Sequence, residues 1–198
     1  MPLNTAERVR IIDTETLSDD WYVLKKTTFE FLRSDNVWQR QSRETYDRGN
    51  GATALLFDPA RETVVLTRQF RLPAFVNGHD GMLIEAPAGL LDAASPEERI
   101  RAELEEETGY RVRDVEKVFE AFMSPGSVTE KLYFFVAHYD SASKVAEGGG
   151  VASEGEDIEV IELPLEQALA MVARGEIVDG KTIMLLQHLA LRLASASA

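Results

Sequence analysis

Three glutamates in the segment SPEERIRAELEEETGY, residues 95–110, have a spacing that could hold a metal ion. Glu103, Glu106 and Glu107 stand at positions i, i+3 and i+4, which gathers them on one side of a helix. Like charges placed in this way repel one another and destabilise the helix unless something positive lies among them. Carboxylate oxygens are the ligands that Mg²⁺ and Mn²⁺ prefer. The pattern therefore predicts a divalent-metal site of the kind that handles phosphates.

A solvated acidic face is the simpler explanation of such a helix, because acidic helices are common. Glu97, Glu98 and Glu105 fit that explanation, since they point toward solvent or toward the start of the helix. The segment before the helix favours the metal site for the other three glutamates. An apolar, strand-like stretch at 82–84 runs into the Pro/Gly turn of EAPAGLLD, residues 85–92. This strand–loop–helix unit brings backbone carbonyls and amides beside the acidic face.

The ends of the helix are specified by local signals. Ser95 can serve as the N-cap, Pro96 as the first helical residue and Glu98 as the third, which together make a capping box. Gly109 stands where a left-handed residue is expected after the last turn. The sequence therefore predicts a helix that begins at Pro96 and ends just before Gly109.

The same helix carries a short apolar stripe for packing on a sheet. Ile100 and Leu104 are four residues apart, so they lie on one face. Glu103 and Glu107 flank this stripe. We therefore expect these two carboxylates at the rim of the buried face rather than fully in water.

The segments EAPAGLLD, SPEE and AELEEETGY resemble the signature of the Nudix hydrolases, which reads G-x5-E-x7-R-E-U-x-E-E-x-G-U with U apolar. The second half of the signature matches Glu103, Leu104, Glu106, Glu107, Gly109 and Tyr110. The first half departs from it. The loop is one residue shorter, the first glutamate is missing near Ala94 or Ser95, and Ala102 occupies the arginine position.

The missing arginine matters because in the resembling enzymes it holds the catalytic glutamates in place. Arg101 is a neighbour in sequence but lies far around the helix from Glu103. Arg99 is four residues before Glu103 and falls on the carboxylate face. Our hypothesis is that Arg99 supplies the missing positive charge.

The resemblance covers nearly the whole chain and is closest to the GDP-mannose pyrophosphatase branch, near the ADP-ribose pyrophosphatases. It rests on SRETYDRGNGATALLFD, RQFRLPAFVNG, EAPAGLLD, MSPGSVTEKLYFFVAHY, GGG…EDIEV and GEIVDGKT. It implies the α/β/α sandwich of the Nudix fold, with a mixed β-sheet between helices, over residues 46–198. It also implies an N-terminal β extension over residues 1–45 that exchanges between the subunits of a homodimer, so that each active site draws on both chains.

The chemistry that the resemblance implies is metal-dependent hydrolysis of a pyrophosphate bond, with Mg²⁺ or Mn²⁺ as the metal. The implied metal ligands are the Ala88 carbonyl, Glu103, Glu107 and Glu156. Glu154 is a rival for the last of these, because the late loop is two residues longer than the branch leads us to expect. Glu106 completes the implied catalytic set, either as a ligand of a second metal or as part of the base network. No single general base is assigned.

Substrate contacts are implied by the same resemblance. The matching positions are Trp21, Arg43, Glu44, Arg71, Gly89, Leu90, Glu130 and Lys181. Arg71 would contact the phosphates, and its alternative role is a surface salt bridge. Trp21 would stack on the base, and its alternative is a place in the core of a strand. The residue before Arg43 is Ser42, where the branch often has lysine.

Three activities remain open. The first is hydrolysis of GDP-mannose to GMP and mannose 1-phosphate, which the late glycine-rich loop and DGKT favour by resemblance. The second is hydrolysis of ADP-ribose to AMP and ribose 5-phosphate. The third is a non-catalytic sensor of nucleotide sugars, which has little need for carboxylates that repel one another.

Composition agrees with an enzyme that acts on a small anionic substrate through metal ions. A net charge of −13 argues against a nucleic-acid partner, and metal ions would neutralise the site for a nucleotide. The 198 residues include no cysteine, no apolar run of about eighteen residues and no signal-peptide core near the start. We therefore expect a cytoplasmic protein with no membrane partner.

The order of the expected elements suits a mixed sheet between helices. Alternating residues predict strands at 21–32 and 37–46 with a turn at 34–36, and continuously apolar residues predict buried strands at 52–57 and 63–67. Further strands are expected at 115–122, 132–139 and 158–163, and helices at 164–174 and 181–194. The acidic, glycine-rich segment 142–156 predicts a mobile loop.

Overall fold

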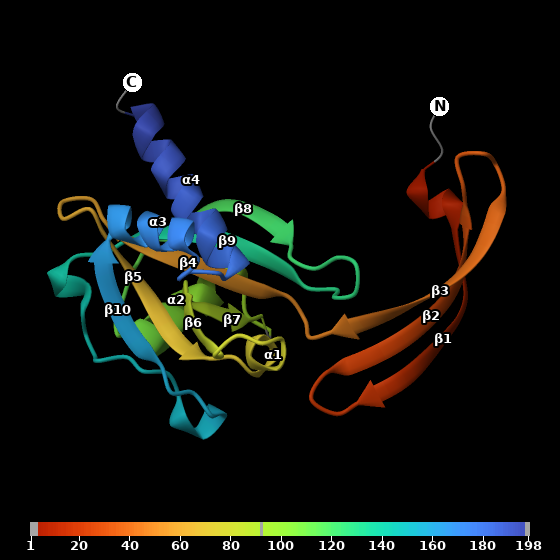
Figure 1. The fold of residues 1–198 in the computed structure, drawn as a ribbon, viewed down its shortest axis with the longest axis horizontal. Coiled ribbons are helices and arrows are strands. Elements are labelled where there is room, and N and C mark those ends of the chain that lie inside the picture. The colour runs from red at the N-terminus through yellow and green to blue at the C-terminus, as the bar shows by residue number, and fades with distance from the viewer. Residues whose placement is uncertain (1–3, 92, 197–198) are drawn as a thin grey trace. The chain divides into compact units, whose positions relative to one another are not determined.

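The computed structural model describes residues 4–91 and 93–196. Figure 1 shows its helices and strands. Contacts within the chain divide the structure into two units. Unit 1 holds the described residues up to Asn50 together with Phe122–Lys131. Unit 2 holds Gly51–Ala121 and the described residues from Leu132 onward.

Unit 1 contains an antiparallel sheet of three strands in the order β1-β2-β3. These strands are β1 Val9–Asp19, β2 Val23–Leu32 and β3 Trp38–Asp47, and the short helix η1 Thr5–Arg8 precedes them. The two predicted strands are confirmed as β2 and β3, with Asn36 at positive φ in the predicted turn. Strand β1 was not predicted, because most of its side chains are exposed and polar. No residue of these three strands is buried.

Unit 2 is built on a mixed sheet in the order β10-β5-β4-β9-β8, with β6 paired to β5 and β7 to β4. Strands β4 and β9 run parallel, and β5, β6, β7 and β10 pair antiparallel with their neighbours. The bounds are β4 Gly51–Asp58, β5 Thr63–Phe70, β6 Met82–Glu85, β7 Ala88–Leu90, β8 Glu116–Phe122, β9 Lys131–His138 and β10 Glu159–Pro164. Every residue of β4 is buried, as its apolar run predicts.

Helices cover both faces of this sheet, which confirms the predicted α/β/α sandwich (Figure 1). Helix α2 lies on one face, and α3 and α4 pack on the other. The bounds are α1 Leu72–Val76, α2 Pro96–Thr108, α3 Leu165–Arg174 and α4 Gly180–Ala196, with the short helices η2 Ser141–Ser143 and η3 Ala152–Glu154. Among the described residues, no helix is both long and apolar enough to cross a membrane.

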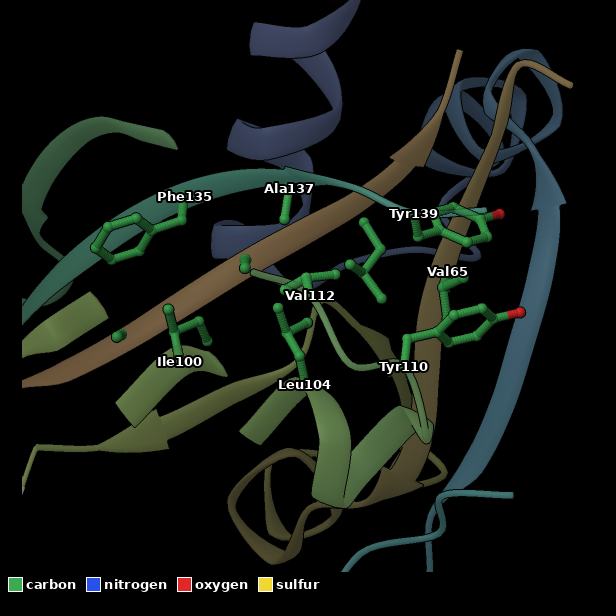
Figure 2. Packing of buried hydrophobic residues seen from close by; sticks show 11 residues of the cluster. Val65, Ile100, Leu104, Tyr110, Val112, Phe135, Ala137 and Tyr139 are labelled. Carbon is green, nitrogen blue, oxygen red and sulfur yellow. The ribbon is translucent and has the colours of Figure 1, made fainter. Parts of the chain in front are cut away.

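The core between α2 and the sheet fixes the position of α2. Ile100 and Leu104 point from the helix toward the sheet, and both are fully buried (Figure 2). They belong to the same cluster as Val65 and Phe135. Burying each such side chain contributes roughly 1.5–3 kcal/mol. The predicted apolar stripe therefore holds the acidic side of α2 in one place.

Candidate functional site

Helix α2 has the ends that its sequence predicts. The Ser95 hydroxyl accepts a hydrogen bond from the Glu98 amide at 3.3 Å, and the Ser95 amide donates to the Glu98 carboxylate at 3.1 Å. Gly109 adopts a φ of 75° after the last turn. These caps satisfy backbone groups that a helix leaves open at its ends.

Two of the three spaced glutamates are more deeply buried than the sequence suggests. Glu103 is 5% exposed and Glu107 is 2% exposed, whereas Glu106 is exposed. Burial raises the pKa of Glu103 to about 7, against the opposing effect of Arg99. Burial, followed by the charges of Glu103 and Glu156, raises the pKa of Glu107 well above its ordinary value. The expectation that both carboxylates lie at the rim of the buried face is therefore corrected to burial.

These two carboxylates differ in their partners. Glu103 forms an ion pair with Arg99, one helical turn earlier. Glu107 Oε2 is buried and has no hydrogen-bond partner among the described residues. An unpaired buried carboxylate oxygen is costly. A cation delivered to this oxygen would remove that cost.

Arg99 and Arg101 should differ in their contribution to metal binding. We expect Arg99→Ala to weaken Mg²⁺ affinity by about tenfold or more, because groups that orient a metal ligand have effects of that size. Arg101→Ala should have a much smaller effect. Calorimetric titration of each variant with Mg²⁺ measures the difference, and equal, small effects would remove the role assigned to Arg99.

The segment before α2 is a short strand rather than the turn that its sequence suggests. Ala88 and Gly89 in β7 pair with Thr53 and Ala52 of β4. A Cβ atom added at Gly89 would lie 1.7 Å from Glu103 Oε1. Gly89 is therefore required for the close approach of the β7 backbone to the Glu103 carboxylate.

This contact makes Gly89→Ala a direct test of the site. The added methyl group must displace the Glu103 carboxylate, so we expect Mg²⁺ affinity to fall by about tenfold or more. Gly126→Ala is the matched control, because a Cβ atom there meets nothing within 4 Å. Calorimetry with Mg²⁺ would contradict the expectation if both variants bound the ion like the unaltered protein.

The glycine-rich segment after β9 is attached to the end of α2, although its sequence suggests a mobile loop. The Gly149 amide donates to the Glu107 carbonyl at 2.9 Å, and the Gly150 amide donates to the Glu106 carbonyl at 3.2 Å. Lys144 Nζ donates to the Thr108 carbonyl at 3.0 Å. These bonds satisfy carbonyls at the last turn of the helix.

This attachment brings Glu156 near the α2 carboxylates. Its Oε2 accepts a hydrogen bond from the Val151 amide at 2.8 Å. Its charge contributes to the raised pKa values of both Glu103 and Glu107, so it lies within electrostatic range of both. The rival residue Glu154 falls in η3, and its side chain lies outside the described part of the structure.

Arg71 and Lys181, far apart in the sequence, share one carboxylate that the sequence did not single out. Arg71 Nε lies 2.7 Å from Glu85 Oε2, and Lys181 Nζ lies 2.6 Å from Glu85 Oε1. The salt bridge considered for Arg71 is therefore present, but its partner is buried. Glu85 ends β6 and begins EAPAGLLD, and a charged residue that ends an apolar strand is the signal that could have found it.

Of the remaining predicted substrate contacts, Leu90 ends β7 and pairs with Gly51 in unit 2, and the other four belong to unit 1. Trp21 lies between β1 and β2 and is 79% exposed, so the alternative that it is a strand-core residue is wrong. Arg43 and Glu44 are exposed on β3. Glu130 forms an ion pair with Arg48 at 3.3 Å.

The donor set fits a hard divalent cation, although the carboxylates do not converge as they stand. No group of three or more His, Cys, Asp or Glu side chains in the described ranges is close enough to hold a metal ion. Glu103 faces Arg99 and Glu156 is bonded to Val151, so each is turned to a protein partner. The charges of Glu103 and Glu156 both raise the pKa of Glu107, and the buried Glu107 oxygen lacks a hydrogen-bond partner in the described structure, so oxygen ligands for a cation lie close together here.

Family models match both parts of the chain. The model described as the NUDIX domain matches residues 47–186. This chain belongs to the NUDIX family. The model described as the GDP-mannose pyrophosphatase NudK N-terminal domain matches residues 8–46.

Relatives of this NUDIX protein match nearly its whole length. It is 57% identical over 185 residues to a protein of Pectobacterium atrosepticum named GDP-mannose pyrophosphatase, covering 93% of this chain and 95% of that protein. A Klebsiella pneumoniae protein of the same name is 56% identical over 182 residues, covering 91% of each. A crystal structure of an ADP compounds hydrolase matches the fold with a TM-score of 0.73 at 18% identity, covering 96% of each chain.

Proposed function

We propose that this protein hydrolyses the pyrophosphate bond of GDP-mannose to give GMP and mannose 1-phosphate. The observation that carries the proposal is the buried oxygen of Glu107 that has no hydrogen-bond partner among the residues the structure describes, in a chain more than half identical to proteins named GDP-mannose pyrophosphatase. A protein that only bound nucleotide sugars would have little need for this carboxylate, which the fold tolerates at a cost.

The site must neutralise a diphosphate before water can attack it. A divalent cation, Mg²⁺ or Mn²⁺, held by Glu103, Glu107, Glu156 and the Ala88 carbonyl would neutralise phosphate charge and lower the pKa of bound water. Arg71 adds positive charge beside these carboxylates, since its charge opposes the rise in the pKa of Glu107. Its side chain is partly exposed and can reach a phosphate oxygen.

The remaining residues serve orientation in this proposal. Arg99 holds Glu103, and Gly89 allows the backbone of β7 to approach the same carboxylate. Water adds to one phosphorus atom as the bond to the bridging oxygen breaks, and the leaving phosphate keeps the electron pair. Glu106 is exposed on α2, so it can accept the proton that the attacking water loses and pass it to solvent. Further proposed substrate contacts are Trp21, Arg43, Glu44, Gly89, Leu90, Glu130 and Lys181.

We also propose that the protein is a homodimer in which a second copy covers the sheet of unit 1. No residue of β1, β2 or β3 is buried, and a small sheet without a covered face is marginal on its own. Ile11, Ile12 and Leu17 are large apolar side chains exposed on β1. Sedimentation should give a dimer at micromolar concentration, and a monomer there would refute this part of the proposal.

The test of the activity is product analysis with Mg²⁺ and, in separate reactions, GDP-mannose and ADP-ribose. GMP and mannose 1-phosphate from GDP-mannose, with slower turnover of ADP-ribose, is the expected result. AMP from ADP-ribose alone would assign the protein to the other substrate class. Tight binding of GDP-mannose without turnover would mean that the protein is a sensor and that the departures in the first half of the signature abolish catalysis.

A further inference from the structure

The buried carboxylate of Glu85 joins two cations from distant parts of unit 2. Its two oxygens lie 2.7 Å from Arg71 Nε and 2.6 Å from Lys181 Nζ, so each oxygen holds one cation. Glu85 is 3% exposed and Lys181 is also buried, so each of these two buried charges compensates the other. Arg71 uses only Nε for this ion pair among the described residues, and its side chain remains 40% exposed.

A second carboxylate fixes the other end of the network. Asp179 Oδ1 lies 3.0 Å from Lys181 Nζ, and its Oδ2 accepts hydrogen bonds from the amide and the hydroxyl of Thr182. The Thr182 hydroxyl in turn accepts a hydrogen bond from the Ala86 amide at 2.6 Å. The start of α4 is thereby tied to the chain immediately after Glu85, at the entry to the β7 segment.

The network lies beside the acidic face of α2. The Ala86 amide, which the network holds, is three residues before Gly89, where the β7 backbone meets the Glu103 carboxylate of α2. The two cations and the two carboxylates of the network cancel in charge. Arg71 and Lys181 can therefore bind a negatively charged ligand. When no ligand is bound, the network holds no excess of buried positive charge.

We propose that Glu85 is a positioning residue that holds Arg71 and Lys181 together as a paired cationic site for the diphosphate of the substrate. This inference rests on the proposed function, because it assigns to that site the part that holds the two phosphates. The spacing of the two cations is set by the two oxygens of one carboxylate. A diphosphate presents two groups of anionic oxygens that suit such a pair.

Glu85→Gln tests the inference, because glutamine keeps the volume but removes the charge and turns one acceptor into a donor. We expect KM for GDP-mannose to rise by about 10-fold to 100-fold, the range typical of groups that orient metal ligands, while kcat changes little. The affinity for inorganic pyrophosphate, measured by calorimetry, should fall by a similar factor. Glu166→Gln, on the exposed start of α3, is the matched control and should change neither quantity.

A mutant cycle that combines three substitutions separates positioning from a purely structural role. If Glu85 acts through the two cations, Glu85→Gln should have little further effect on pyrophosphate affinity once Arg71→Gln and Lys181→Met are in place. An equally large effect in that background would overturn the inference. So would unchanged KM and pyrophosphate affinity in Glu85→Gln, or a fall in kcat at constant KM.

A folding failure of Glu85→Gln and a failure of the proposed function have different consequences for this inference. If thermal melting shows that Glu85→Gln does not fold, Glu85→Asp replaces it, since the shorter carboxylate cannot reach both cations and should raise KM. An unchanged KM in the aspartate variant would then overturn the inference. If the unaltered protein fails to hydrolyse GDP-mannose, the proposed function fails, and the pyrophosphate titrations still decide whether Glu85 positions the two cations.

Discussion

Glu107→Gln should reduce kcat/KM for GDP-mannose by about 100-fold to 1,000-fold at saturating Mg²⁺. The proposed metal contributes several kcal/mol of charge stabilisation, and each 1.36 kcal/mol corresponds to a factor of ten in rate. Glutamine preserves the shape of the side chain but cannot offer a charged oxygen to the cation. A coupled assay of released mannose 1-phosphate measures the loss.

The same substitution should not destabilise the metal-free protein. Glu107 is buried and one of its oxygens has no hydrogen-bond partner in the part of the chain that the structure describes, so removing its charge removes a desolvation cost. Thermal melting in a chelator should therefore give an equal or higher midpoint for Glu107→Gln. Glu105→Gln is the matched control on the same helix, because Glu105 pairs with Arg111 at the surface. Near-normal activity in Glu107→Gln would exclude this carboxylate from the site.

Leu104→Ala should lower the free energy of unfolding by about 2–5 kcal/mol. Leu104 is fully buried between α2 and the sheet, and its truncation leaves a cavity in addition to the lost burial (Figure 2). Denaturant titration of the metal-free protein measures the change without interference from ion binding.

The control for this prediction is the same substitution at an exposed leucine. Leu191 lies on α4 and is 71% exposed, so Leu191→Ala should change stability by about 0.5 kcal/mol or less. If the two variants lost similar amounts, the packing of α2 against the sheet would not be what stabilises this unit.

Much of the α2 region could be predicted because its signals are local. The capping pair Ser95 and Glu98, and the left-handed Gly109, act within a few residues of the helix ends. The apolar stripe follows from helical spacing alone. Burial of Glu103 and Glu107 could not be predicted to this depth, because it depends on β7 and on the glycine-rich segment that packs at the end of the helix.

Features that depend on long-range contacts could not be predicted from the sequence. Glu85 and Lys181 are 96 residues apart, and no local pattern connects them. Strand β1 was missed because nearly all of its side chains are exposed and alternation is therefore weak. The exposure of Trp21 could not be predicted either, because burial of a residue near a strand depends on which elements cover the strand.

The two caps and the buried stripe also set the rotational phase of α2. A helix turns by about 100° per residue, so one residue inserted between Leu104 and Glu107 would swing that carboxylate away while the stripe stayed on the sheet. One residue lost before Ser95 shortens only the connection from β7 and leaves the phase unchanged. Length variation among related chains should therefore be tolerated in that connection and rejected within the helix, and the shortened loop of this protein falls on the tolerated side.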